Sequence, residues 1–178
     1  MASLPEIRSE VTRNFGAKPL WLTEYGYQTN PPDRLLGVSY AQQASYIGEA
    51  ALRVWQQPGV TILIQFLIRD EPTVGGWQSG LLSVRGAAKP SYHAFALPLA
   101  EVSRQGARTV LWGQVRPGAG RRSYVLQRSV GGRWQPVGTD ATTGPGGTFV
   151  RTVALPAGTR VRILATDLGY ASPALILS

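Results

Sequence analysis

The stretch PLWLTEYG, residues 19–26, decides how the first part of the chain folds. Its apolar run is short, follows a proline and ends in polar residues before a glycine, which is typical of a buried strand. The stretch VTILIQFL, residues 60–67, is a second such run and is rich in β-branched residues. It is also followed by charged groups, at residues 69–71. The sequence therefore predicts two strands whose carboxyl ends carry charged side chains.

Helical patterns separate and flank these strands. Ser39 and Gln42 have the spacing of a capping box and predict a helix that stops at Pro58-Gly59. We expect the buried side of this helix to carry Ile47, Ala51, Val54 and Trp55. Shorter helices are predicted for residues 4–15, where Leu4, Ile7, Val11 and Phe15 share one face, and for residues 90–96. Two strands joined by a helix form a βαβ unit, which predicts a parallel pair with its binding site at the carboxyl ends.

From Thr109 onward the pattern changes to short alternating strands, with turn signals about every 8–12 residues. The clearest hairpin joins residues 124–127 to residues 134–137 through Gly131-Gly132. About six strands are expected in this part. We therefore predict an α/β part at residues 1–103, followed by a small immunoglobulin-like β-sandwich at residues 104–178.

The net charge of +8 belongs to the second part. Residues 1–100 hold eight basic and seven acidic side chains, whereas residues 101–178 hold ten arginines and three acidic residues. This balance allows two interpretations, an interface for nucleic acid or another acidic polymer, or a solvated arginine-rich surface. Only Arg121 and Arg122 are adjacent and no nucleic-acid motif accompanies them, which favours the solvated surface.

Composition excludes several kinds of site. The chain has no cysteine, which excludes disulfides, thiol chemistry and cysteine-bound metals. His93 is the single histidine, so no multi-histidine metal site is possible, and we expect neither metal nor cofactor. The longest uncharged stretch, residues 54–68, is too short and too polar to cross a membrane. Glu6 and Glu10 fall where a signal peptide would need apolar residues, so no leader is expected at the start of this sequence.

Several motifs in residues 1–100 resemble one family. PLWLTEYGY, residues 19–27, resembles the seventh strand of the retaining glycoside hydrolases in the (β/α)8 clan that includes families 5 and 39. IQFLIRD, residues 64–70, resembles their eighth strand, and residues 75–82 with 89–95 resemble the loop and helix that close the barrel. The second part is similar to β-sandwiches appended to secreted bacterial glycosidases. The resemblance implies the last two βα units of a (β/α)8 barrel (a TIM barrel), an extracellular location and a role in carbohydrate metabolism.

The resemblance also implies roles for individual residues. Glu24 would be the nucleophile of retaining hydrolysis, the alternative being an ordinary carboxylate in an ion pair. Trp77 would be a platform for a sugar ring, or else a core residue. The weaker candidates for substrate binding are Tyr25, Gln65, Arg69 and Asp70. We expect Arg69 and Asp70 to pair with each other, and His93 to be structural.

The chain holds less than half of such a barrel. A complete one takes about 250 residues, and the Asn-Glu pair that supplies the family's acid/base is absent from the sequence. We therefore expect a glycosidase of oligo- or polysaccharides that is inactive until the missing barrel portion, or another copy of the chain, completes it. An uncovered strand pair would expose Trp21, Leu22 and Leu63. The alternative is a non-catalytic module that binds polysaccharide or spaces domains. Membrane and nucleic-acid partners are not expected.

Overall fold

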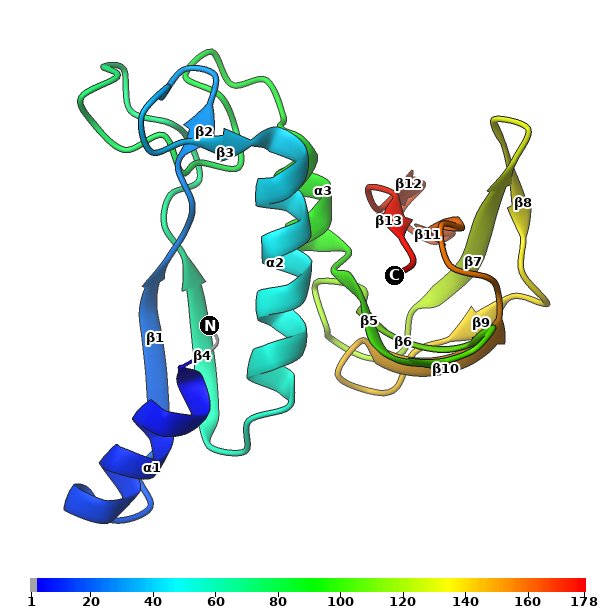
Figure 1. Cartoon of the computed structure of the whole chain (residues 1–178), viewed down its shortest axis with the longest axis horizontal. Helices are drawn as coiled ribbons and strands as arrows, with labels where there is room; N and C mark the ends of the chain where they lie inside the picture. Colours follow the sequence, from blue (N-terminus) through cyan, green and yellow to red (C-terminus); the bar gives the residue numbers. More distant parts are fainter. Residues whose placement is uncertain (1–2) are drawn as a thin grey trace.

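The computed structural model describes residues 3–178 and shows an α/β part joined to a β part (Figure 1). The α/β part contains α1 (Leu4–Phe15), β1 (Leu20–Tyr25), β2 (Thr29–Asn30), β3 (Val38–Ser39), α2 (Tyr40–Trp55), β4 (Val60–Gln65) and α3 (Pro90–Ala96). The three predicted helices and both predicted strands are present, and the short β2 and β3 were not predicted. Of residues 3–178, no helix combines the length and the apolar character needed to cross a bilayer.

The predicted parallel pairing of the two main strands is confirmed. β1 and β4 form a two-stranded parallel sheet in which Leu20 pairs with Val60 and Leu22 with Leu63. The register shifts between Leu22 and Tyr25, near the carboxyl end of β1. α2 runs alongside this pair and packs against β4 (Figure 1).

The capping box at the start of α2 is also confirmed. The Gln42 N–H donates to Ser39 Oγ at 3.2 Å, and the Ser39 N–H donates to Gln42 Oε1 at 3.0 Å. On the predicted buried side, Ile47 and Ala51 are buried as expected. Val54 is only partly buried and Trp55 is half exposed, so the prediction was wrong for the last turn. The last turn faces the β part instead, where the Trp55 ring lies 5.8 Å from that of Trp112.

The β part contains nine strands instead of about six. They are β5 (Leu99–Gln105), β6 (Arg108–Gln114), β7 (Ser123–Val130), β8 (Arg133–Pro136), β9 (Ala141–Thr142), β10 (Thr148–Ala154), β11 (Arg160–Ala165), β12 (Tyr170–Ala171) and β13 (Leu175–Ile176). One antiparallel sheet has the order β10-β6-β5 and the other β12-β11-β7-β8, with β9 on β7 and β13 on β11. The β7–β8 hairpin matches the prediction. The expected change of fold after residue 103 falls inside β5.

A core between the two sheets holds the β part together. It contains Leu111, Phe149 and Val153 from one sheet and Leu126 and Ile163 from the other, all buried. Because both sheets contribute inward-facing residues, the packing is that of a sandwich. A smaller cluster joins the two parts of the chain: Ala51 and Leu52 of α2, Ala100 of β5 and Trp112 of β6.

Candidate functional site

Glu24 lies near the carboxyl end of β1, and its side chain is exposed. Its neighbour Tyr25 turns toward α2, because the Tyr25 hydroxyl donates to the Tyr46 carbonyl of that helix at 2.9 Å. Burial of the phenol, together with the nearby Tyr27 and Glu49, raises the pKa of Tyr25 well above its usual value. Successive side chains of a strand point to opposite faces. Between Leu22 and Tyr25 the register shifts, and β1 has one residue more than β4 there. Next to Tyr25, Glu24 therefore belongs to the face turned away from α2, the same face as Trp21 despite their odd spacing.

The face that carries Glu24 is open. Leu63 and Gln65 line a small cavity against Ile47 and Ala51 of α2, which places Ile64 on the opposite face. Ile64 is 46% exposed, and Trp21, which alternates with Leu22 on the paired strand, is 63% exposed. Large apolar side chains at these exposures are unusual for a parallel sheet, whose two faces are normally covered. As expected, Trp21 is exposed, whereas Leu22 and Leu63 are partly buried on the α2 side.

Gln65, like Tyr25, faces α2 and not the side of Glu24. Its amide Nε2 donates to the Ser79 carbonyl at 2.9 Å and to the Phe66 carbonyl at 3.0 Å. These bonds tie the end of β4 to the loop that follows it. Two of the predicted substrate-binding residues therefore lie on the opposite face from the predicted nucleophile, with their donor groups in use.

Asp70 makes a buried ion pair with Lys89, so the expected pairing with Arg69 is wrong. Asp70 Oδ1 lies 2.7 Å from Lys89 Nζ, and the two side chains are 3% and 1% exposed. Asp70 Oδ1 also accepts the Gly80 N–H at 2.9 Å. The Arg69 side chain is exposed at the surface instead. Asp70 is thus a structural carboxylate at the base of the loop, closed off from ligand.

Lys89 is the centre of a network that the sequence did not reveal. Besides Asp70, its ammonium donates to Thr29 Oγ1 at 2.8 Å and to the Gln78 carbonyl at 3.2 Å. Burial lowers the pKa of Lys89, and the Asp70 carboxylate opposes that shift. The network joins β2, the loop after β4 and the start of α3, which holds the loop around residues 70–80 against the strand ends.

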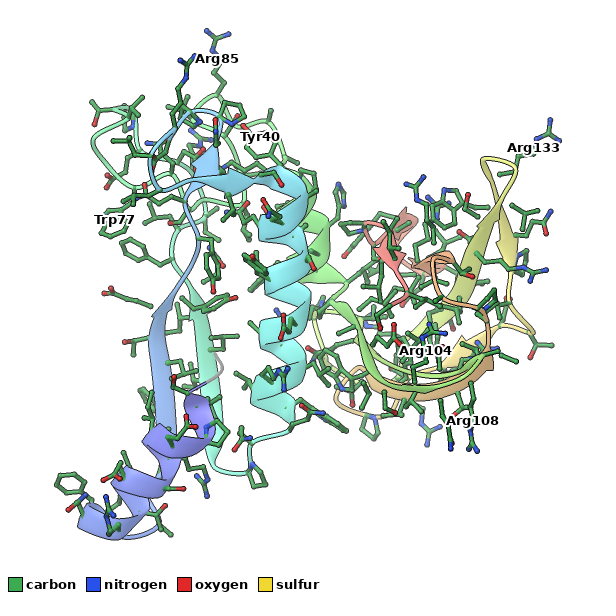
Figure 2. All side chains as sticks on the ribbon, viewed as in Figure 1. Tyr40, Trp77, Arg85, Arg104, Arg108 and Arg133 are labelled. Carbon is green, nitrogen blue, oxygen red and sulfur yellow. The ribbon has the colours of Figure 1, made fainter. Side chains whose placement is uncertain are left out.

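Trp77 is presented by this loop. Its indole is 53% exposed and makes an edge contact with the Phe66 ring, with the centroids 5.8 Å apart. The backbone N–H of Trp77 donates to Glu71 Oε2 at 2.7 Å, and this bond fixes the backbone that carries the ring. Figure 2 shows Trp77 projecting outward beyond the parallel strands. This exposure excludes the interpretation of Trp77 as a fully packed core residue.

His93 lies between the two parts of the chain. It is partly buried on α3, with its ring 5.5 Å from that of Tyr92 and 6.0 Å from that of Tyr170. These contacts bridge α3 and the β part, in keeping with a structural role. Within residues 3–178, no group of three His, Asp or Glu side chains is arranged to hold a metal ion.

Comparison with known proteins assigns no family. No family model matches the chain, and no curated protein matches it. Among solved structures, the chain is similar to a calcium-binding mutant of Bacteroides uniformis beta-glucuronidase 2, with a TM-score of 0.49 and 12% identity. The alignment covers 99% of this chain and 23% of that one. At this level of similarity the functional assignment rests on the residues of this chain alone.

Proposed function

We propose that this chain is part of a retaining glycoside hydrolase, that Glu24 is its nucleophile, and that further barrel strands complete the site. The observation that carries the proposal is the position of Glu24. It is an exposed carboxylate at the carboxyl end of a parallel strand, on a sheet face that the described residues leave open. A nucleophile must be held at a fixed point beside its substrate, and a strand end on a packed βαβ unit meets that need.

Retaining hydrolysis needs a second carboxyl group about 5–5.5 Å from the nucleophile. The two carboxylates that follow β4 are both in use: Asp70 pairs with Lys89, and Glu71 accepts the Trp77 N–H. Asp70 is thereby closed off from solvent, and Glu71 is held on the loop after β4. We infer that the acid/base comes from strands outside this chain, so the isolated chain should not turn over glycosides.

The apolar character of the open face supports completion by further strands. Trp21 and Ile64 lie on it beside Glu24, and an apolar sheet face of this kind is stable when another layer covers it. In a barrel that layer is the packed interior, filled by side chains of all the strands. The same closure would bring the second carboxylate to Glu24.

The test uses the natural reading frame that surrounds this sequence. If about 150–200 further barrel residues with an Asn-Glu strand end precede it, the complete protein is expressed and assayed on aryl glycosides. Glu24→Gln should lower kcat by at least about 10⁴-fold, because the covalent step is lost. Glu24→Ala should regain turnover when azide is added, forming a glycosyl azide of inverted configuration.

Two results would overturn this proposal. One is turnover by the isolated wild-type chain that Glu24→Gln abolishes, since the chain alone would then hold both carboxylates. The other is full activity of the complete protein carrying Glu24→Gln. As a matched control, Glu49→Gln changes an exposed carboxylate on α2, paired with Arg53, and should leave kcat unchanged.

A further inference from the structure

The outer face of the larger sheet carries an arginine held in one orientation. Tyr124, Leu126, Val161 and Ile163 point into the core, so the residues that alternate with them point outward. Arg162 pairs with Gln127 across β11 and β7. We define the basic face as the outward-pointing Gln127, Trp134, Arg160 and Arg162.

Two contacts fix the Arg162 guanidinium. Its Nε donates to Gln127 Oε1 at 2.8 Å, and its central carbon lies 4.3 Å from the centroid of the Trp134 ring. The guanidinium is thus held over the indole, while its two terminal nitrogens make no hydrogen bond within residues 3–178. An arginine fixed in this way presents two parallel N–H donors, the geometry that binds a carboxylate bidentately.

The basic face lacks its own counter-charge. Of the three acidic residues in the β part, Glu101 pairs with Arg104 and Asp167 pairs with Arg122, whereas Asp140 makes no salt bridge within residues 3–178. Among residues 3–178, no salt bridge involves Arg160 or Arg162. Burial lowers the pKa of Arg162, since its charge loses water without gaining a carboxylate. An anionic ligand would supply the missing partner.

We propose that the basic face binds a carboxylate-bearing polysaccharide. Arg162 binds one carboxylate bidentately, and the exposed Arg160 attracts the next carboxylate along the polysaccharide chain. A polysaccharide fits better than a nucleic acid. Nucleic-acid sites of this kind offer free aromatic rings for base stacking, whereas Arg162 occupies the Trp134 ring.

The test measures binding of the whole chain to polygalacturonate by affinity electrophoresis and titration calorimetry. The methyl ester of the same polymer is the matched ligand control, because it keeps the backbone and loses the charge. Wild type should bind the acid and not the ester. Arg162→Gln should raise the Kd about tenfold or more, the loss expected for a charge-assisted bidentate contact.

Three further variants make the result decisive. Arg162→Lys keeps the charge but loses the pair of parallel N–H donors, so it should also weaken binding. Arg160→Gln should weaken binding to a lesser degree. Arg108→Gln removes an exposed arginine from β6 in the other sheet, where Figure 2 shows it pointing away from the molecule, and should bind like wild type. Circular dichroism checks that each variant is folded.

Equal loss of affinity in Arg108→Gln and Arg162→Gln would overturn the proposal, because binding would then depend on net charge alone. Equal binding of the acid and its ester would also overturn it, as would tighter binding of a duplex DNA of matched charge. The inference does not depend on Glu24. Loss of polygalacturonate binding and loss of catalysis are measured separately, so the two proposals can fail independently.

Discussion

Lys89 and Asp70 form an ion pair that is closed off from solvent, with 2.7 Å between Nζ and Oδ1. Nineteen residues separate them in sequence, and the pair ties the start of α3 to the end of the β4 region. A buried pair of this kind orients its surroundings more than it adds to stability, because both charges have lost their water. Here it secures the loop that presents Trp77.

Replacing Lys89 by methionine should strongly destabilise the protein. The change leaves Asp70 charged and buried without its partner, which costs about 3–5 kcal/mol. Urea denaturation measures the free energy of unfolding. The double variant Lys89→Met/Asp70→Asn removes the unpaired buried charge and should recover part of the lost free energy of unfolding. A double variant no more stable than Lys89→Met would contradict this account.

Tyr25 should make the fold sensitive to alkali. Its pKa is raised above the usual value of 10.0, so the folded state keeps the phenol proton that the unfolded chain releases. The contribution is fully present below pH 10 and is lost as the pH rises beyond it, by up to about 1.4 kcal/mol per pH unit. Denaturation between pH 9 and about 11.5 should show a shallower decline for Tyr25→Phe than for wild type.

Trp112 should couple the two parts of the chain. It is buried in the cluster that joins α2 to β5 and β6, and its ring contacts that of Trp55. Trp112→Ala should cost about 3–5 kcal/mol and should separate the unfolding of the α/β part from that of the β part. Differential scanning calorimetry would then record two transitions. A single transition at the wild-type temperature would argue against this coupling.

The open face beside Glu24 should bind a dye that reports exposed apolar surface. Trp21→Ser/Ile64→Ser should lower the fluorescence of the bound dye and change stability little, because both side chains already contact solvent. Leu35→Ser is the control: Leu35 is almost fully exposed but lies outside this face, in the loop between β2 and β3. Equal dye binding by wild type and the double variant would show that the face is covered in solution.

Local sequence patterns predicted most of the fold. Strand and helix periodicity, the capping box at Ser39 and the Gly131-Gly132 turn correctly placed α1, α2, α3, β1, β4 and the β7–β8 hairpin. Each of these signals depends on residues close together in the chain. The short strands β2, β3, β9 and β12 gave no such signal, because two residues are too few to show a period.

The sequence by itself determined the parallel βαβ unit, the β-sandwich and the position of Glu24 at a strand end. Only the tertiary structure decided which polar groups remain free. In the structure, Asp70 is buried in an ion pair with Lys89, and Tyr25 and Gln65 face α2. The Arg162 guanidinium lies over the ring of Trp134. Periodicity is local, whereas burial and ion pairing depend on contacts between segments far apart in the chain, so the free carboxylate and the free guanidinium became visible only in the folded molecule.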